Sequence, residues 1–143
     1  MTPKYIIIHH TAVSREANAK QFEAIKRYHK SKGWGDIGYH YLIDPDGRLN
    51  KGRQDNEIGA HCSHAGMNMK SIGIALSGNF ETEKPTDYQI FMLRDILQIL
   101  SKRYRITRSR ILGHKETGAA TACPGKNLAM EFVRNLTIMQ GKE

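Results

Sequence analysis

The order of hydrophobic and polar positions along the chain predicts a series of strands and helices. Residues 5–8 are aromatic and β-branched and lie between a proline and polar residues, which is typical of a buried central strand. Small and large apolar residues alternate in 71–76, which predicts a strand buried on both faces with another backbone close by. Shorter strands are expected at 38–43, 48–51 and 110–112, with a hairpin turn at 44–47.

Three segments have the spacing of amphipathic helices. The first runs from about Glu16 to Lys32, and Gly33 follows in a position to end it. The second is the clearest, because Thr86 and Gln89 form a capping box ahead of an apolar stripe. The tail from Asn127 predicts a last helix. Since no repeat or linker divides the chain, we expect a single α/β domain, residues 1–143, with a central mixed β-sheet flanked by helices.

The composition is that of a folded domain. With 39% hydrophobic and 25% charged residues among 143, the chain falls in the globular range. No apolar run approaches the roughly 18 residues that a membrane-spanning helix requires, so we expect no transmembrane segment. The first ten residues lack the length and the cleavage site of a secretory signal, and we therefore expect synthesis in the cytoplasm.

The charge balance indicates attraction to anionic partners without identifying one. The 22 Lys and Arg residues against 14 Asp and Glu give a net charge of +8. A nucleic-acid partner would require a recognition helix, an aromatic ribonucleoprotein strand or a zinc-finger spacing, and the sequence has none of them. We therefore expect no binding to nucleic acid.

Candidate metal ligands stand at the ends of predicted strands. His9 and His10 close the first strand, where successive side chains point to opposite faces, so only one of them can join a given site. His114 follows another short strand, and Cys123 lies in the loop after it. Two imidazoles and a thiolate would supply three ligands of a tetrahedral zinc and leave the fourth position for water, which is the catalytic pattern. On spacing alone, satisfied polar histidines and a small buried cysteine remain the alternative.

Further polar residues stand close to these segments. Tyr39 and Tyr41 lie on one face of a predicted strand and His40 on the other, while His61 and His64 lie in a predicted loop. Core packing of the aromatic rings and a solvated loop for the two histidines are the structural alternatives.

A series of short blocks extends through nearly the whole chain. In order, they read IIIHHTA (6–12), YH (28–29), GWGDIGYHY (33–41), DG (46–47), GR (52–53), GAH (59–61), SIGIALSGN (71–79), GH (113–114) and TACPG (121–125). Together they resemble the zinc-dependent N-acetylmuramoyl-L-alanine amidases of the type shared by phage lytic amidases and peptidoglycan recognition proteins. Two residues before the cysteine, where the phage enzymes usually carry a lysine, this chain has Thr121, as catalytic recognition proteins do.

The resemblance implies a fold, a metal and a set of site residues. The fold is that of the peptidoglycan recognition proteins and amidases, and the cofactor is one Zn²⁺. Its implied ligands are His9, His114 and Cys123, with His10 facing away from the metal. Tyr39 and Thr121 are the implied catalytic groups, and the implied walls of the substrate groove are His29, His61 and His64.

The resemblance also implies the reaction. The substrate is peptidoglycan, cut at the amide between N-acetylmuramic acid and the L-alanine of the stem peptide. We expect a monomer that reaches the cell wall after release or export, in the manner of a phage or bacterial lysin. Two alternatives are a module of the same fold that binds muropeptides without cutting them, and a domain in which the metal serves stability only. The presence of Cys123 favours the enzyme.

Overall fold

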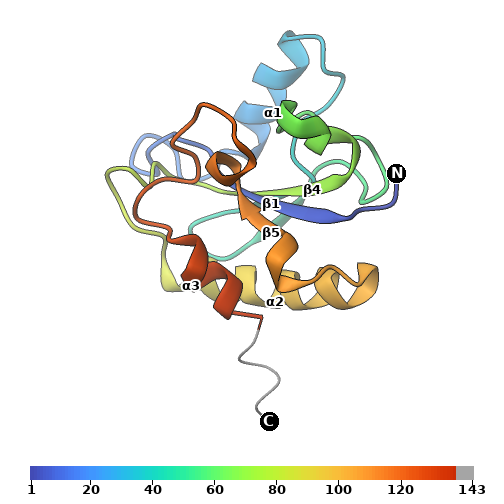
Figure 1. Ribbon diagram of the computed structural model, residues 1–143. Helices are drawn as coiled ribbons and strands as arrows, with labels where there is room; N and C mark the ends of the chain where they lie inside the picture. Colours follow the sequence, from blue (N-terminus) through green and yellow to red (C-terminus); the bar gives the residue numbers. More distant parts are fainter. Residues whose placement is uncertain (138–143) are drawn as a thin grey trace.

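A five-stranded mixed sheet forms the centre of the computed structural model, which describes residues 1–137 (Figure 1). Its strand order is β3-β2-β4-β1-β5. Strands β2, β4, β1 and β5 run parallel to one another, and β3 pairs with β2 in the antiparallel direction. The strands are β1 (Tyr5–His10), β2 (Tyr41–Ile43), β3 (Leu49–Lys51), β4 (Ser71–Leu76) and β5 (Ile111–Gly113). The α/β class and the mixed sheet are confirmed.

Helices cover both faces of the sheet, as Figure 1 shows. α1 (Phe22–Ser31) lies on one face, and α2 (Asp87–Tyr104) and α3 (Met130–Asn135) lie on the other. Three short 3-10 turns complete the structure: η1 (His64–Met69), η2 (Arg108–Arg110) and η3 (His114–Thr117). None of the helices in residues 1–137 is long and apolar enough to cross a bilayer.

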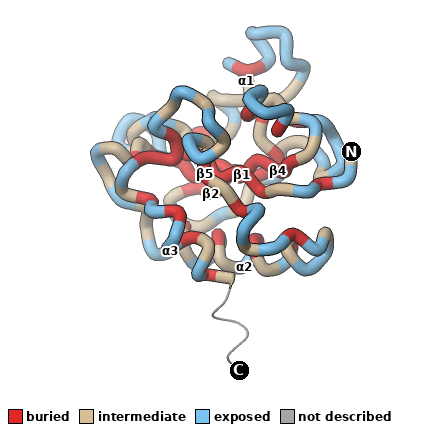
Figure 2. The backbone as a smooth tube through the Cα atoms, viewed as in Figure 1, coloured by how far each residue is buried: buried red, intermediate tan, exposed pale blue. Residues whose placement is uncertain are grey.

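The central strands are buried on both sides, which explains their continuous apolar sequence (Figure 2). Ile6 and Ile8 of β1 contribute to the larger core cluster, which includes Leu93 and Leu97 of α2. Ile7 points to the other face and packs with Met67. The buried sheet therefore fixes the positions of the side chains that project from the ends of its strands.

Helix α2 begins where the sequence predicts. The Thr86 hydroxyl accepts a hydrogen bond from the Gln89 amide at 3.1 Å, and the Gln89 side chain accepts one from the Thr86 amide at 3.0 Å. The capping box is therefore confirmed. Arg105 ends the helix in the left-handed conformation, with φ of 55°.

Two predicted helix starts are wrong, and in both cases side-chain hydrogen bonds explain the difference. α1 begins at Phe22 and not near Glu16. The side-chain amide of Gln21 donates hydrogen bonds to the backbone carbonyls of Val13 and Asn18, and these bonds hold the segment before the helix in turns. α3 begins at Met130 and not at Asn127, which instead donates from its backbone to Phe80 and from its side chain to Glu83.

Four predicted strands also have different limits: β1 continues to His10 instead of ending at residue 8, and β3 begins at Leu49 instead of Arg48. β2 starts at Tyr41, because Gly38 donates its amide to the His29 ring and accepts from Ala60, both outside the sheet ladder. β5 is displaced by one residue, since Arg110 belongs to η2.

Candidate functional site

Two neighbouring strands bring the candidate metal ligands to one edge of the sheet. Ile8 of β1 pairs with Gly113 of β5, so the residues that follow them in the chain, His9 in β1 and His114 at the start of η3, lie side by side near the ends of the two strands. Cys123 comes to the same place from the loop between η3 and α3. One ligand atom from each of these three residues lies within 4.8 Å of the other two.

The donor set fits a zinc ion. His9 Nδ1 lies 3.6 Å from Cys123 Sγ, and ligands bound at ~2.1 Å and ~2.3 Å to a tetrahedral centre stand about 3.6 Å apart. The sulfur also accepts a hydrogen bond from the His10 amide at 3.3 Å. Burial raises the pKa of the Cys123 thiol to about 12, so a thiolate at this position needs a cation beside it.

His10 is engaged on the opposite face of β1. Its Nδ1 accepts a hydrogen bond from the Phe80 amide at 3.0 Å, and it is absent from the group of candidate ligands. The alternation of side chains along a strand accounts for the different environments of His9 and His10.

A hollow of about 240 Å³ opens beside the three candidate ligands. Tyr39 and Thr121 line it together with His29 and His61, so four of the five remaining predicted site residues meet here. His64 does not line it and is exposed at the start of η1. An adjoining hollow of about 390 Å³ shares Trp34, His61 and His114 with the first, which extends the concave surface.

Tyr39 lies between two histidines of the site. Its ring centroid is 5.3 Å from that of His9 and 5.7 Å from that of His29. Burial, reinforced by nearby Cys123, raises the pKa of the Tyr39 hydroxyl, which therefore stays protonated and can donate a hydrogen bond. The Thr121 hydroxyl accepts from the Cys123 amide at 3.1 Å, which leaves its own proton free to donate.

Comparison with known proteins identifies the family. A family model described as N-acetylmuramoyl-L-alanine amidase matches residues 1–126. The chain belongs to this amidase family.

Relatives of this amidase-family chain include both enzymes and recognition proteins. It is 41% identical over 134 residues to peptidoglycan-recognition protein SC2 of Drosophila melanogaster, an alignment that covers 90% of this chain and 71% of the relative. The solved N-acetylmuramoyl-L-alanine amidase LysC from Clostridium intestinale is 35% identical, with a TM-score of 0.83 and coverage of 94% and 84%. Peptidoglycan recognition proteins LCa and LCx, solved as a complex with tracheal cytotoxin, show 32% identity, a TM-score of 0.80 and coverage of 94% and 82%.

The environment of His61 in this amidase-family fold is poorly predicted by the sequence. It is 9% exposed and not in a solvated loop, and its Nδ1 lies 2.9 Å from His9 Nε2. Burial, with a smaller contribution from His40, lowers the pKa of His61 to about 3, so the ring is neutral at physiological pH. A Cβ atom added at Gly73 would stand 2.6 Å from this ring. Gly73 of β4 therefore leaves room for the His61 side chain. The sequence pattern of this strand instead predicts that its small residues leave room for another backbone.

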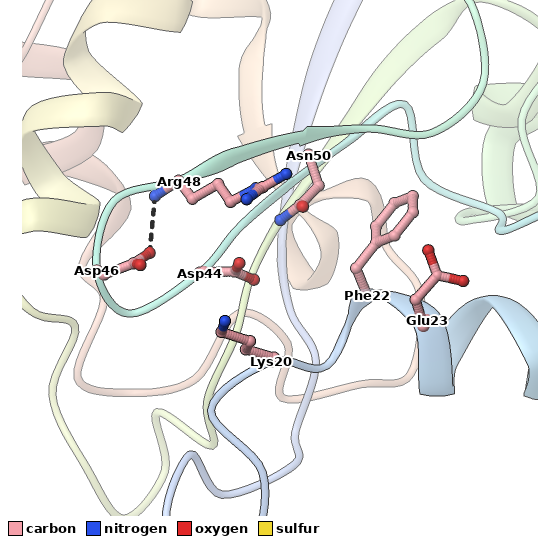
Figure 3. A pocket seen from close by; sticks show the side chains of 7 residues that line it. All are labelled: Lys20, Phe22, Glu23, Asp44, Asp46, Arg48 and Asn50. Carbon is pink, nitrogen blue, oxygen red and sulfur yellow. Dashed lines mark hydrogen bonds between the residues drawn. The ribbon is translucent and has the colours of Figure 1, made fainter.

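A third hollow, of about 220 Å³, lies away from the two beside the candidate ligands, between the start of α1 and the β2–β3 hairpin (Figure 3). Acidic and basic side chains both line it, and Asp46 accepts a hydrogen bond from the Arg48 amide. Asp44 Oδ1 is buried there without a hydrogen-bond partner among residues 1–137. Among residues 1–137, however, the only three candidate ligands gathered tightly enough for a metal are His9, His114 and Cys123.

Proposed function

We propose that the protein is a zinc-dependent amidohydrolase that cleaves the amide between N-acetylmuramic acid and L-alanine in peptidoglycan. The observation that carries this proposal is the meeting of two histidines and a cysteine at one edge of a hollow that Tyr39 and Thr121 also line. Membership of the amidase family and the likeness to a solved amidase support it.

In this proposal, His9, His114 and Cys123 hold the zinc ion. Three protein ligands leave one position open, as catalytic zinc sites require. When bound, zinc would lower the pKa of a water molecule toward ~7 and polarise the amide carbonyl. Two neutral imidazoles and one thiolate leave a formal charge of +1 at the site, so the centre remains cationic.

Tyr39 supplies a hydrogen-bond donor at the wall of the hollow. The tetrahedral intermediate of amide hydrolysis carries negative charge on the former carbonyl oxygen, and a positioned O–H stabilises that charge. Because the raised pKa of Tyr39 keeps its proton in place, we assign it this role. Thr121, with a free hydroxyl proton beside Cys123, is the second donor.

Two of the remaining predicted residues would bind substrate. His29 is held by the Gly38 amide, which donates to its Nδ1 at 2.9 Å, and it stands on the wall of the hollow. We assign His29 and the exposed His64 to contacts with the glycan or the stem peptide. His61 also lines the hollow, but both of its ring nitrogens face partners inside the protein, His9 and Ser71. The net charge of +8 would favour association with anionic wall polymers. We further propose that a monomer acts on the wall as a lysin.

Mass spectrometry of purified peptidoglycan tests the proposal. Zinc-loaded protein should release stem peptides with a free L-alanine amino group, and chelated protein should release none. Protein that stays bound to peptidoglycan but generates no new amine would contradict the proposal. This result would indicate that the protein binds muropeptides without cutting them, and it would agree with the likeness to recognition proteins LCa and LCx.

A further inference from the structure

A buried hydrogen-bonded chain links β4 to the candidate metal site. Ser71 Oγ lies 2.6 Å from the Met67 carbonyl and 3.4 Å from His61 Nε2. The hydroxyl has a single proton, which it donates to the carbonyl at the shorter distance. Its oxygen is therefore left to accept from His61, and the His61 proton resides on Nε2.

This proton position determines the direction of the next hydrogen bond. A neutral imidazole with its proton on Nε2 has an acceptor at Nδ1. His61 Nδ1 lies 2.9 Å from His9 Nε2, so His9 must donate and must carry its own proton on Nε2. His9 Nδ1 is then unprotonated, and it is this atom that faces Cys123 Sγ at 3.6 Å.

We propose that His61 is a positioning residue that selects the metal-binding tautomer of His9 and fixes the orientation of its ring. This role deepens the proposed function, since it rests on the same three ligands, but it concerns metal affinity and not the chemistry of the substrate. Outer partners of this kind fix the tautomer of ligating histidines in many metal sites.

The surroundings of His61 hold its ring in place. A Cβ atom would stand 2.6 Å from His61 Cδ2 if added at Gly59, and 2.6 Å from His61 Cγ if added at Gly73. The two glycines thus leave room for the imidazole on either side. The backbone of the loop is also fixed, because the Asn68 side chain accepts from the amides of His61 and Cys62 at 2.8 Å and 2.7 Å.

Three variants test the role through zinc affinity, measured by competition with a chromophoric chelator. His61→Leu removes the acceptor and should weaken zinc binding by about 10–100-fold. His61→Asn places an amide oxygen near the former Nδ1 and should recover most of the loss. Gly73→Ala removes no polar group but displaces the ring, and it should weaken binding as well. Ile74→Val, on the opposite face of the same strand, is the packing control and should leave zinc affinity unchanged.

Nitrogen NMR of the metal-free wild-type protein gives a measurement that needs no variant. The expected spectrum has both His9 and His61 protonated on Nε2. A proton on His9 Nδ1, or an unchanged zinc affinity in folded His61→Leu, would overturn the inference. Unchanged affinity with reduced cleavage would instead assign His61 to the substrate. If zinc affinity falls as expected while wild-type protein cleaves no peptidoglycan, the inference stands and the proposed function fails.

Discussion

Arg134 of α3 donates two parallel hydrogen bonds to the carboxylate of Glu116 in η3, from Nη1 to Oε1 at 2.8 Å and from Nη2 to Oε2 at 3.1 Å. Glu116 also accepts from the Gly113 amide at 2.9 Å, directly before His114. The carboxylate thus ties the short turn that carries His114 to the C-terminal helix. A bidentate pair of this kind fixes the relative orientation of the two side chains and also strengthens their interaction.

Replacing this carboxylate should loosen the His114 turn. We expect Glu116→Ala to lower the free energy of unfolding by about 1 kcal/mol, from the lost cap and ion pair. Zinc affinity should fall with it, because His114 is less well held. Chemical denaturation and zinc titration measure the two effects. Glu131→Ala is the control, since Glu131 is 67% exposed and also pairs with Arg134 but does not contact the turn. Equal effects of both substitutions on zinc affinity would contradict the prediction.

The environment of the Asp55 carboxylate predicts how the free energy of unfolding depends on pH in the acid range. Its carboxylate is only 11% exposed and accepts from Tyr41 at 2.6 Å, Lys51 at 2.6 Å and Tyr104 at 2.8 Å. Burial alone would raise its pKa, but the hydrogen bonds from Lys51, Tyr41 and Tyr104 outweigh burial and lower the pKa from 3.8 to about 2.

A pKa that is lower in the folded state stabilises the fold at any pH above the unfolded value. The contribution of Asp55 should therefore be complete above about pH 4 and be lost as the pH falls toward about 2. Asp55→Asn should destabilise the protein at neutral pH and flatten this part of the acid profile. Urea unfolding across this range measures it, with exposed Asp95→Asn as the control. An unchanged acid profile in Asp55→Asn would refute the prediction.

The sequence predicts features that depend on local chemistry better than those that depend on distant contacts. The capping box at Thr86 and the strand-end position of His9 follow from neighbouring residues, and the structure has both. The start of α1 does not follow, because Gln21 finds its hydrogen-bond partners only in the folded loop. His61 is harder still, since its partner His9 is far away in the sequence. The one local signal for its burial is Gly73, a residue without a side chain in the middle of a strand.

Metal removal should inactivate the protein without unfolding it. The core clusters on both faces of the sheet are complete without the candidate ligands His9 and His114. We expect chelation to abolish amide cleavage, to lower the melting temperature through the loss of a ligand that binds the folded state, and to leave circular dichroism unchanged. A cooperative thermal transition after chelation would agree with this. Unfolding on chelation would instead identify a metal that serves stability.

The two cysteines should respond differently to substitution. Both are buried and free, but only Cys123 belongs to the group of candidate ligands. Cys123→Ser replaces a soft anionic ligand by a neutral hydroxyl and should sharply reduce zinc affinity and cleavage. Cys62→Ala is the matched control, and it should cost some packing stability without changing zinc content. Wild-type zinc content in Cys123→Ser, determined by metal analysis, would remove Cys123 from the proposed ligands.

Tyr39 offers the sharpest separation of catalysis from packing. Tyr39→Phe keeps the ring beside His9 and removes only the hydroxyl, so fold and zinc content should survive. Turnover should fall by about 10²–10³, the usual cost of losing one positioned donor to a developing oxyanion, with little change in substrate binding. Tyr41→Phe is the matched control, because its hydroxyl binds Asp55 and Lys51, so it should lower stability and spare turnover. Zinc content, melting temperature and cleavage rate are measured on one preparation of each variant. If Tyr39→Phe turned over at the wild-type rate, the donor role would pass to Thr121, whose hydroxyl stands beside Cys123.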